Sequence, residues 1–160
     1  MTEIEVRRAG PDDAPALVRL RGLMLEAMGQ DLGGPDAPWR DVALRYFTDQ
    51  LSSPASFAAF VADDPEAGVV ANAAGHVTVH PPGPKDPTTL RGALYNVSTE
   101  PAFRRRGLAR ACVTALLDWY RDETGVGQVE LHATEEGAEL YHSLGFVDSR
   151  YSTQRLHVPR

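Results

Sequence analysis

The chain has 160 residues, a formal net charge of −6 and one cysteine, Cys112. This length suits one domain with a sizeable core, and the apolar fraction of 42% and charged fraction of 24% are ordinary for a globular protein. The acidic balance argues against non-specific nucleic-acid binding, the lone cysteine excludes an internal disulfide, and no apolar run approaches the roughly 18 residues that span a bilayer.

Two further features of the composition concern location and ligand. The first eight residues lack the apolar core of a signal peptide, so we expect a cytoplasmic protein with neither a nucleic-acid nor a membrane partner. The negative charge lies in residues 1–100, which carry 14 acidic against 8 basic side chains. Since an acidic surface attracts cations, this imbalance favours a cationic ligand.

Hydrophobic periodicity and turn residues predict the elements of the chain. The first part of the chain is predicted to form a strand at 4–8, a helix from the Gly10–Asp13 turn to about Gly29, a helix at 39–51, and strands at 57–62, 69–79 and 94–97. The second part is predicted to form a helix from Leu108, a strand at 128–133 and a helix from 134 or 135 to 144. Two more strands are predicted after it, one that begins at 145 and one at 152–158. Gly75 predicts a bulge or a close approach in its strand. The order indicates a mixed α/β fold around one sheet, with the first two helices as a lobe beside it.

Residues 95–110 combine a strand, a proline, three consecutive arginines and the start of a helix. The helix macrodipole disfavours cations at this end, so Arg104–Arg106 are costly there unless an anion is bound. Gly107 and the small Ala109 remove side-chain bulk, which lets a ligand approach the backbone N–H groups of the helix start. We interpret this stretch as a cradle for a phosphate or pyrophosphate.

Two motifs resemble the Gcn5-related N-acetyltransferase (GNAT) superfamily. Arg104-x-x-Gly107-x-Ala109 is similar to the Gln/Arg-x-x-Gly-x-Gly/Ala pyrophosphate motif of that family, and residues 140–146 are similar to its Leu-Tyr-x-x-Leu-Gly-Phe ending. The resemblance covers nearly the whole chain in element order. It implies one acyltransferase domain over residues 1–160, with a mixed, mostly antiparallel central sheet flanked by about four helices.

The resemblance also implies an acetyl-CoA site. Val97, Ser98 and Thr99 match the strand whose backbone groups hydrogen-bond the pantetheine arm and the acyl carbonyl. The turn that holds the pyrophosphate is matched by Arg104, Arg105, Arg106, Gly107, Leu108, Ala109 and Arg110. Tyr141 matches the tyrosine proposed to protonate the departing thiolate. Many members carry asparagine where this chain has Thr134, whose hydroxyl replaces part of that hydrogen bonding.

Transfer of an acyl group to an amine needs a neutral amine, a stabilised oxyanion and a protonated leaving thiolate. A phenol such as that of Tyr141 suits the last task. Glu100 and His132 are the candidate bases, with His76 and His80 as further histidines, and the sequence does not choose among them. Cys112 lies on the apolar stripe of its helix, so we expect a buried thiol and direct attack of the amine on the thioester.

The acceptor is left open between a small-molecule amine and a protein amine. The loops at 29–38 and 81–87, which we expect to contact it, carry no recognisable chemical signature, and Trp39, Tyr46 and Phe47 form either a substrate wall or core. No metal-ligand spacing is present. A non-catalytic acyl-CoA-binding sensor or assembly module, or a site for another phosphate-bearing ligand, remains an alternative. The resemblance allows a homodimer and leaves the oligomeric state open.

Overall fold

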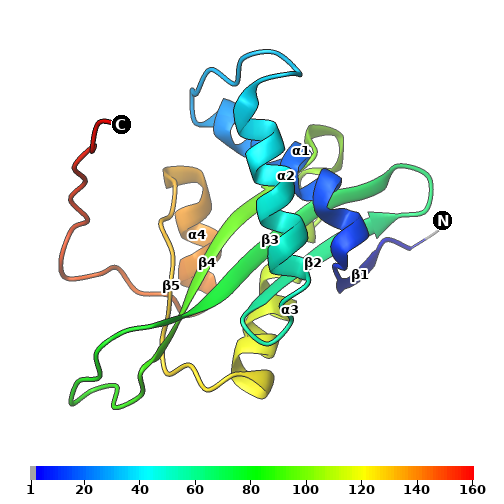
Figure 1. Cartoon of the computed structure of the whole chain (residues 1–160). Coiled ribbons are helices and arrows are strands. Elements are labelled where there is room, and N and C mark those ends of the chain that lie inside the picture. The colour runs from blue at the N-terminus through cyan, green and yellow to red at the C-terminus, as the bar shows by residue number, and fades with distance from the viewer. Residues whose placement is uncertain (1–2) are drawn as a thin grey trace.

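The computed structural model describes residues 3–160, and in this range a five-stranded sheet is flanked by four α-helices (Figure 1). The strands are β1 (Glu5–Arg8), β2 (Phe57–Asp64), β3 (Gly68–Val79), β4 (Leu90–Thr99) and β5 (Val129–Glu130). The helices are α1 (Ala14–Ala27), α2 (Pro38–Leu51), α3 (Leu108–Glu123) and α4 (Glu135–Ser143), with 3₁₀ turns η1 (Pro11–Asp13) and η2 (Pro101–Phe103). The sheet order is β1-β2-β3-β4-β5, antiparallel except for the parallel β4–β5 pair. The predicted mixed, mostly antiparallel α/β fold is confirmed.

The sheet is buried on both faces. Phe57, Ala59 and Val61 of β2 pack under α1 and α2, while Ala58 and Ala62, which point the opposite way, pack against the α3 side. Side chains alternate across a strand, so this continuous apolar run supplies two cores at once. The first two helices therefore cover one face of the sheet, as Figure 1 shows, and the predicted lobe beside the sheet is wrong.

The close approach predicted at Gly75 is confirmed, and its partner is a side chain from the other face. A Cβ atom added at Gly75 would lie 2.2 Å from the Tyr120 hydroxyl, which donates to the carbonyls of His76 and Ala93, both at 3.0 Å. This glycine gives room for a hydroxyl that joins β3 to β4 through α3. The β3–β4 irregularity itself lies nearby, where the register shifts between Asn72 and Ala74.

That irregularity bends β4 at Asn96. The residue has a positive φ of 57°, and asparagine tolerates this left-handed region better than most side chains. Its amide is buried and donates to the Asn72 side chain at 2.9 Å and to the Leu17 carbonyl at 3.4 Å. The bulge is thus fixed from both β3 and α1.

The two strands predicted after α4 are wrong. Residues 147–160 are exposed throughout and form no strand, and Figure 1 draws the end of the chain running clear of the sheet. A strand needs a paired edge, but β5 is only two residues long. Gly145 turns with a φ of 97°, and Asp148 then contacts the His142 ring at 2.7 Å, so the chain folds back on α4.

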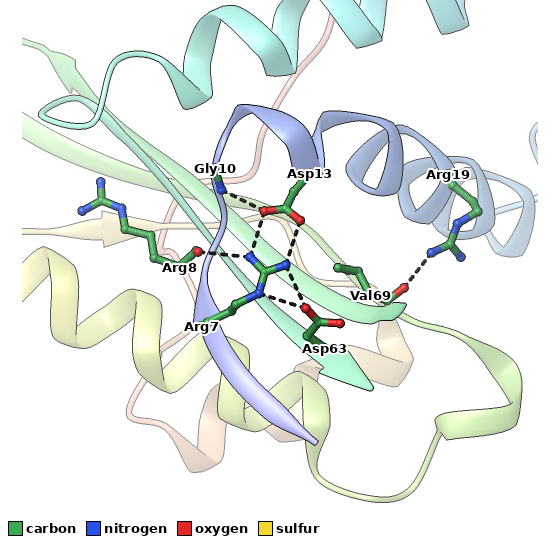
Figure 2. A network of polar contacts seen from close by, with 7 residues as sticks. All are labelled: Arg7, Arg8, Gly10, Asp13, Arg19, Asp63 and Val69. Carbon is green, nitrogen blue, oxygen red and sulfur yellow. Dashed lines mark hydrogen bonds and ion pairs between the residues drawn. The ribbon is translucent and has the colours of Figure 1, made fainter. Parts of the chain in front are cut away.

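An ion-pair network joins the first elements of the chain (Figure 2). Arg7 donates to both carboxylate oxygens of Asp13 at 2.9 Å and to Asp63 at 3.0 Å. The hydrogen bonds from Arg7, opposed by burial, hold the pKa of Asp13 below its usual range. The network fastens β1, η1 and β2 at the sheet edge. No helix among residues 3–160 has the length and apolar character to cross a membrane.

Candidate functional site

The strand edge next to β5 opens in the middle of β4. β5 pairs with β4 only at Gly92–Val129 and Ala93–Glu130, whereas β4 continues to Thr99. Beyond Ala93 the side of β4 away from β3 has no strand partner among residues 3–160, so its backbone groups can bind a ligand. Val97, Ser98 and Thr99 lie on this open length and are partly exposed.

The predicted anion cradle, residues 104–110, follows this edge through η2. Gly107 caps α3 in the left-handed region, with φ 75° and ψ 15°, and Arg105 also has a positive φ, 63°. No heavy atom lies within 4 Å of a Cβ built at Gly107, so this position needs glycine for its backbone conformation. The first N–H groups of α3 have no partner within the helix and point out of its exposed end.

The arginines differ in their surroundings. Arg104, Arg105 and Arg106 lie in the turn that precedes α3. Arg104 donates to the Thr99 carbonyl at 3.2 Å, and the Arg106 guanidinium lies 5.0 Å from the Phe103 ring centroid. All three are exposed, so their charges face an arriving anion.

Arg110 and Thr134 have structural partners as well. Arg110 donates to the Ser143 hydroxyl at 2.7 Å and thereby ties α3 to α4. The Thr134 hydroxyl caps α4 by accepting from the Gly137 N–H at 3.2 Å. Its own proton remains available for donation, because the cap uses only the oxygen.

Tyr141 lies on α4 with its ring nearly buried. The side chain is 9% exposed and meets Phe146 edge-on, with 5.9 Å between ring centroids. Burial raises the pKa of the phenol, so it stays protonated at neutral pH. The hydroxyl has no hydrogen-bond partner within residues 3–160 and is free to donate. The packing on Phe146 and a donor role are therefore compatible.

The candidate nucleophile and the candidate bases differ in burial and in their partners. Cys112 is fully buried, and burial raises the pKa of its thiol to about 12, so it is an inert core residue, as expected. Glu100 is held in an ion pair by Arg19, and His132 is exposed just beyond β5. Within residues 3–160 no group of three or more His, Cys, Asp or Glu side chains could hold a metal ion.

A pocket of about 900 Å³ opens on the other face of the sheet, between α1, α2 and the strands. We call it the Tyr95 pocket; its lining is Arg21, Leu25, Gln30, Asp31, Leu32, Trp39, Val42, Ala43, Tyr46, Phe47, His76 and Tyr95. The loop at 29–38 contributes to this lining, whereas the loop at 81–87 does not. Trp39, Tyr46 and Phe47 line the pocket and also pack around the core.

A chain of polar groups crosses the Tyr95 pocket. The hydroxyls of Tyr46 and Tyr95 lie 2.5 Å apart, and the His76 Nδ1 atom lies 3.3 Å from the Tyr95 hydroxyl. Burial lowers the pKa of His76, which therefore stays neutral at pH 7. The structure thus brings His76 into a pocket next to β4. Arg21 and Tyr95 were not predicted as site residues, because they come from separate elements and form no contiguous motif.

Comparisons with known proteins agree with this architecture. The family model described as "Acetyltransferase (GNAT) family" matches residues 23–146. The chain therefore belongs to the GNAT acetyltransferase family. A comparison with curated proteins gave no significant match.

Solved structures share the fold over nearly the whole chain. A GCN5-related N-acetyltransferase from Ralstonia eutropha JMP134 has a TM-score of 0.79 and 26% identity, covering 96% of this chain and 98% of that one. A predicted acetyltransferase from Clostridium acetobutylicum, solved with acetyl-CoA, has a TM-score of 0.83 and 24% identity, with 96% of each chain covered. Glucosamine-6-phosphate N-acetyltransferase from Arabidopsis thaliana has a TM-score of 0.74 and 16% identity, covering 97% and 99%.

Proposed function

We propose that this protein is an acyl-CoA-dependent N-acyltransferase that transfers acetyl from acetyl-CoA directly to a primary amine. The observation that carries the proposal is the continuity of the open β4 edge with the cradle. Beyond Ala93 the side of β4 away from β3 has no strand partner among residues 3–160 as far as Thr99, and only η2 separates Thr99 and Glu100 from the arginines and Gly107. An extended ligand arm with an anionic end suits this arrangement. Family membership and a neighbour solved with acetyl-CoA support the choice of ligand.

The residues present suit acetyl-CoA, which when bound would supply the acyl group as a thioester. Val97, Ser98 and Thr99 would hold the pantetheine arm through backbone groups on the open edge. Residues 104–109 would hold the pyrophosphate, with the α3 N–H groups as donors and the arginines as surrounding positive charge. Arg110 would act mainly by keeping α4 against α3, since its guanidinium contacts Ser143. Thr134 would position α4 through its cap, and its hydroxyl keeps an O–H donor that the cap does not use.

The chain's own groups supply the chemistry in two places. A backbone N–H such as that of Val97 would polarise the carbonyl under attack, and one such donor is typically worth ~3 kcal/mol. Tyr141 would donate its proton to the departing sulfur, because burial keeps the phenol protonated.

The acceptor amine must lose its proton before it attacks. An ordinary alkyl ammonium, with a pKa near ~10.4, is neutral only about one part in 10³ at pH 7. The apolar walls of the Tyr95 pocket would disfavour its charged form, and His76, neutral at pH 7, would accept the proton directly or through water.

We further propose that residues 1–160 work as one acyltransferase domain on a small-molecule or protein amine in the cytoplasm. The single buried cysteine supports a reducing compartment. A homodimer would agree with the resemblance to the family, and analytical ultracentrifugation would measure it.

The decisive experiment measures thiol release from acetyl-CoA against a panel of primary amines. We expect thiol release to require both the protein and an amine, and we expect mass spectrometry to identify the acetylated amine. Tight binding of acetyl-CoA with no turnover on a broad panel would contradict catalysis and favour the binding-module alternative. A thermal shift produced by nucleotides as large as that produced by CoA would point to another phosphate-bearing ligand.

A further inference from the structure

We infer that Arg21 binds a carboxylate of the acceptor, so that the acceptor is an amine carrying both a carboxylate and an apolar or aromatic body. This inference rests on the proposed function and specifies its substrate class. It also departs from the cationic acceptor that the acidic first part of the sequence favours.

Arg21 is a cation in the lining of the Tyr95 pocket, and no carboxylate among residues 3–160 forms an ion pair with it. Its Nη1 atom donates to the Asn96 side chain at 3.2 Å. Arg19, two residues earlier on α1, is in contrast neutralised by an ion pair with Glu100 and also donates to the Val69 carbonyl at 2.6 Å. A guanidinium has five N–H donors in a planar fork that matches a carboxylate. Most of the Arg21 donors therefore remain available for a ligand.

The contact with Asn96 fixes where this charge lies. Asn96 is 2% exposed and is held by Asn72 and the Leu17 carbonyl, so its side-chain oxygen is a rigid acceptor for Arg21. Asn96 forms the β4 bulge, and Val97 follows it on the open edge. A carboxylate on Arg21 would thus lie beside the strand that is proposed to hold the acyl carbonyl. An α-amino acid, whose amine is one carbon from its carboxylate, satisfies that proximity.

The remaining lining defines the body of the acceptor. Leu25, Trp39, Val42, Ala43 and Phe47 give the pocket apolar and aromatic walls. Apolar surface of this extent favours an aliphatic or aromatic group over a sugar or a polyamine. The one carboxylate of the lining, Asp31, is exposed and accepts from the Gly33 N–H at 3.0 Å. Arg21 is the charged group of the lining that contacts the bulge residue Asn96, and binding of a simple cationic amine by Asp31 is the competing outcome of the test.

Matched pairs of ligands test the inference on the full chain. L-phenylalanine and 2-phenylethylamine differ by the carboxylate alone, as do L-leucine and isopentylamine. Their dissociation constants would be measured by calorimetry with saturating CoA, for the parent, for Arg21→Met and for Arg45→Met. Arg45 is an exposed arginine of α2 outside the lining and serves as the matched control.

The parent is expected to bind at least one amino acid about tenfold or more tightly than its decarboxylated partner. Arg21→Met should reduce this ratio to about one or two, while Arg45→Met keeps it. If Arg21→Met lowers the thermal midpoint markedly, Arg21→Lys, which keeps the charge but not the fork, should give an intermediate ratio. Equal or tighter binding of the plain amines by the parent, no binding of either amino acid, or an unchanged ratio in Arg21→Met would overturn the inference.

Thiol release separates this inference from the proposed function. Carboxylate-dependent binding without any acetyl transfer would sink the proposed function and leave the Arg21 assignment standing. Rapid acetylation of plain amines, with amino acids acetylated no faster, would support the proposed function and overturn the Arg21 assignment.

Discussion

The cradle follows β4 through η2 and the Tyr95 pocket is lined by Tyr95 of β4, yet the two sites are built in opposite ways. The cradle is one continuous segment, exposed and cationic, and its capping glycine has a left-handed backbone. The Tyr95 pocket combines side chains from α1, α2, the loop between them, β3 and β4, and its walls are mostly apolar. A backbone-based site depends on local conformation, whereas a side-chain-based pocket depends on how distant elements pack. On the proposed assignment, a local backbone-based cofactor site can be kept while the side chains of the acceptor pocket vary.

The largest expected effect comes from a substitution of Tyr141 on α4. Tyr141→Phe removes the donor without changing the ring that packs on Phe146, so kcat should fall by about 10²-fold or more while the KM for acetyl-CoA changes little. Stopped-flow or steady-state thiol release measures both. Tyr151→Phe, in the exposed last segment, is the control and should match the parent. Full activity in Tyr141→Phe would exclude Tyr141 as the acid.

Gly107→Val tests whether the cradle depends on backbone conformation. The φ of 75° disfavours a β-branched side chain although there is space for it, so we expect a loss of about 1–2 kcal/mol in the free energy of unfolding. A shifted turn would also weaken acetyl-CoA binding by about tenfold. Gly10→Ala is the matched control, because Gly10 has φ −112° and an empty surrounding. Unaltered stability and affinity in Gly107→Val would refute the conformational requirement.

Gly75→Ala tests the contact of α3 with strands β3 and β4. Its Cβ atom would collide with the Tyr120 hydroxyl and disrupt two hydrogen bonds that join β3 to β4, so we expect about 2–4 kcal/mol of destabilisation in urea unfolding. The double variant Gly75→Ala/Tyr120→Phe should be more stable than the sum of the single variants predicts. Simple additivity would show that the glycine acts on stability in another way.

The smallest effect concerns the polar chain of the Tyr95 pocket. The folded-state pKa of His76 is lowered by burial, so its neutral form is favoured in the native protein. Its contribution to stability is therefore complete above the unfolded pKa of about 6.5 and is lost as the pH falls below it. Urea unfolding at pH 7.5 and pH 5 should show a smaller loss of stability in His76→Gln than in the parent. An equal loss would mean that other groups control this window.

The sequence allowed prediction of the features that depend on neighbouring residues. Gly107, the arginine run and Tyr141 belong to contiguous motifs, and the apolar stripe of α3 correctly placed Cys112 in the core. The Tyr95 pocket could not be predicted from the sequence, because Arg21 and Tyr95 become neighbours only when α1 packs over β4. The failed strands after α4 have a similar cause. A strand at 152–158 requires an edge with which to pair, and β5 is too short to provide it.

Calorimetric titration of acetyl-CoA into three proteins tests the separation of the two sites most directly. The proteins are the parent, the cradle variant Arg105→Gln/Arg106→Gln and the pocket variant Arg21→Met. We expect the cradle variant to bind at least about tenfold more weakly, with a reduced salt dependence, and the pocket variant to stay within about twofold of the parent. An equal loss in the pocket variant, or no binding of acetyl-CoA by the parent, would contradict the assignment of the cradle to the cofactor and of the Tyr95 pocket to the acceptor.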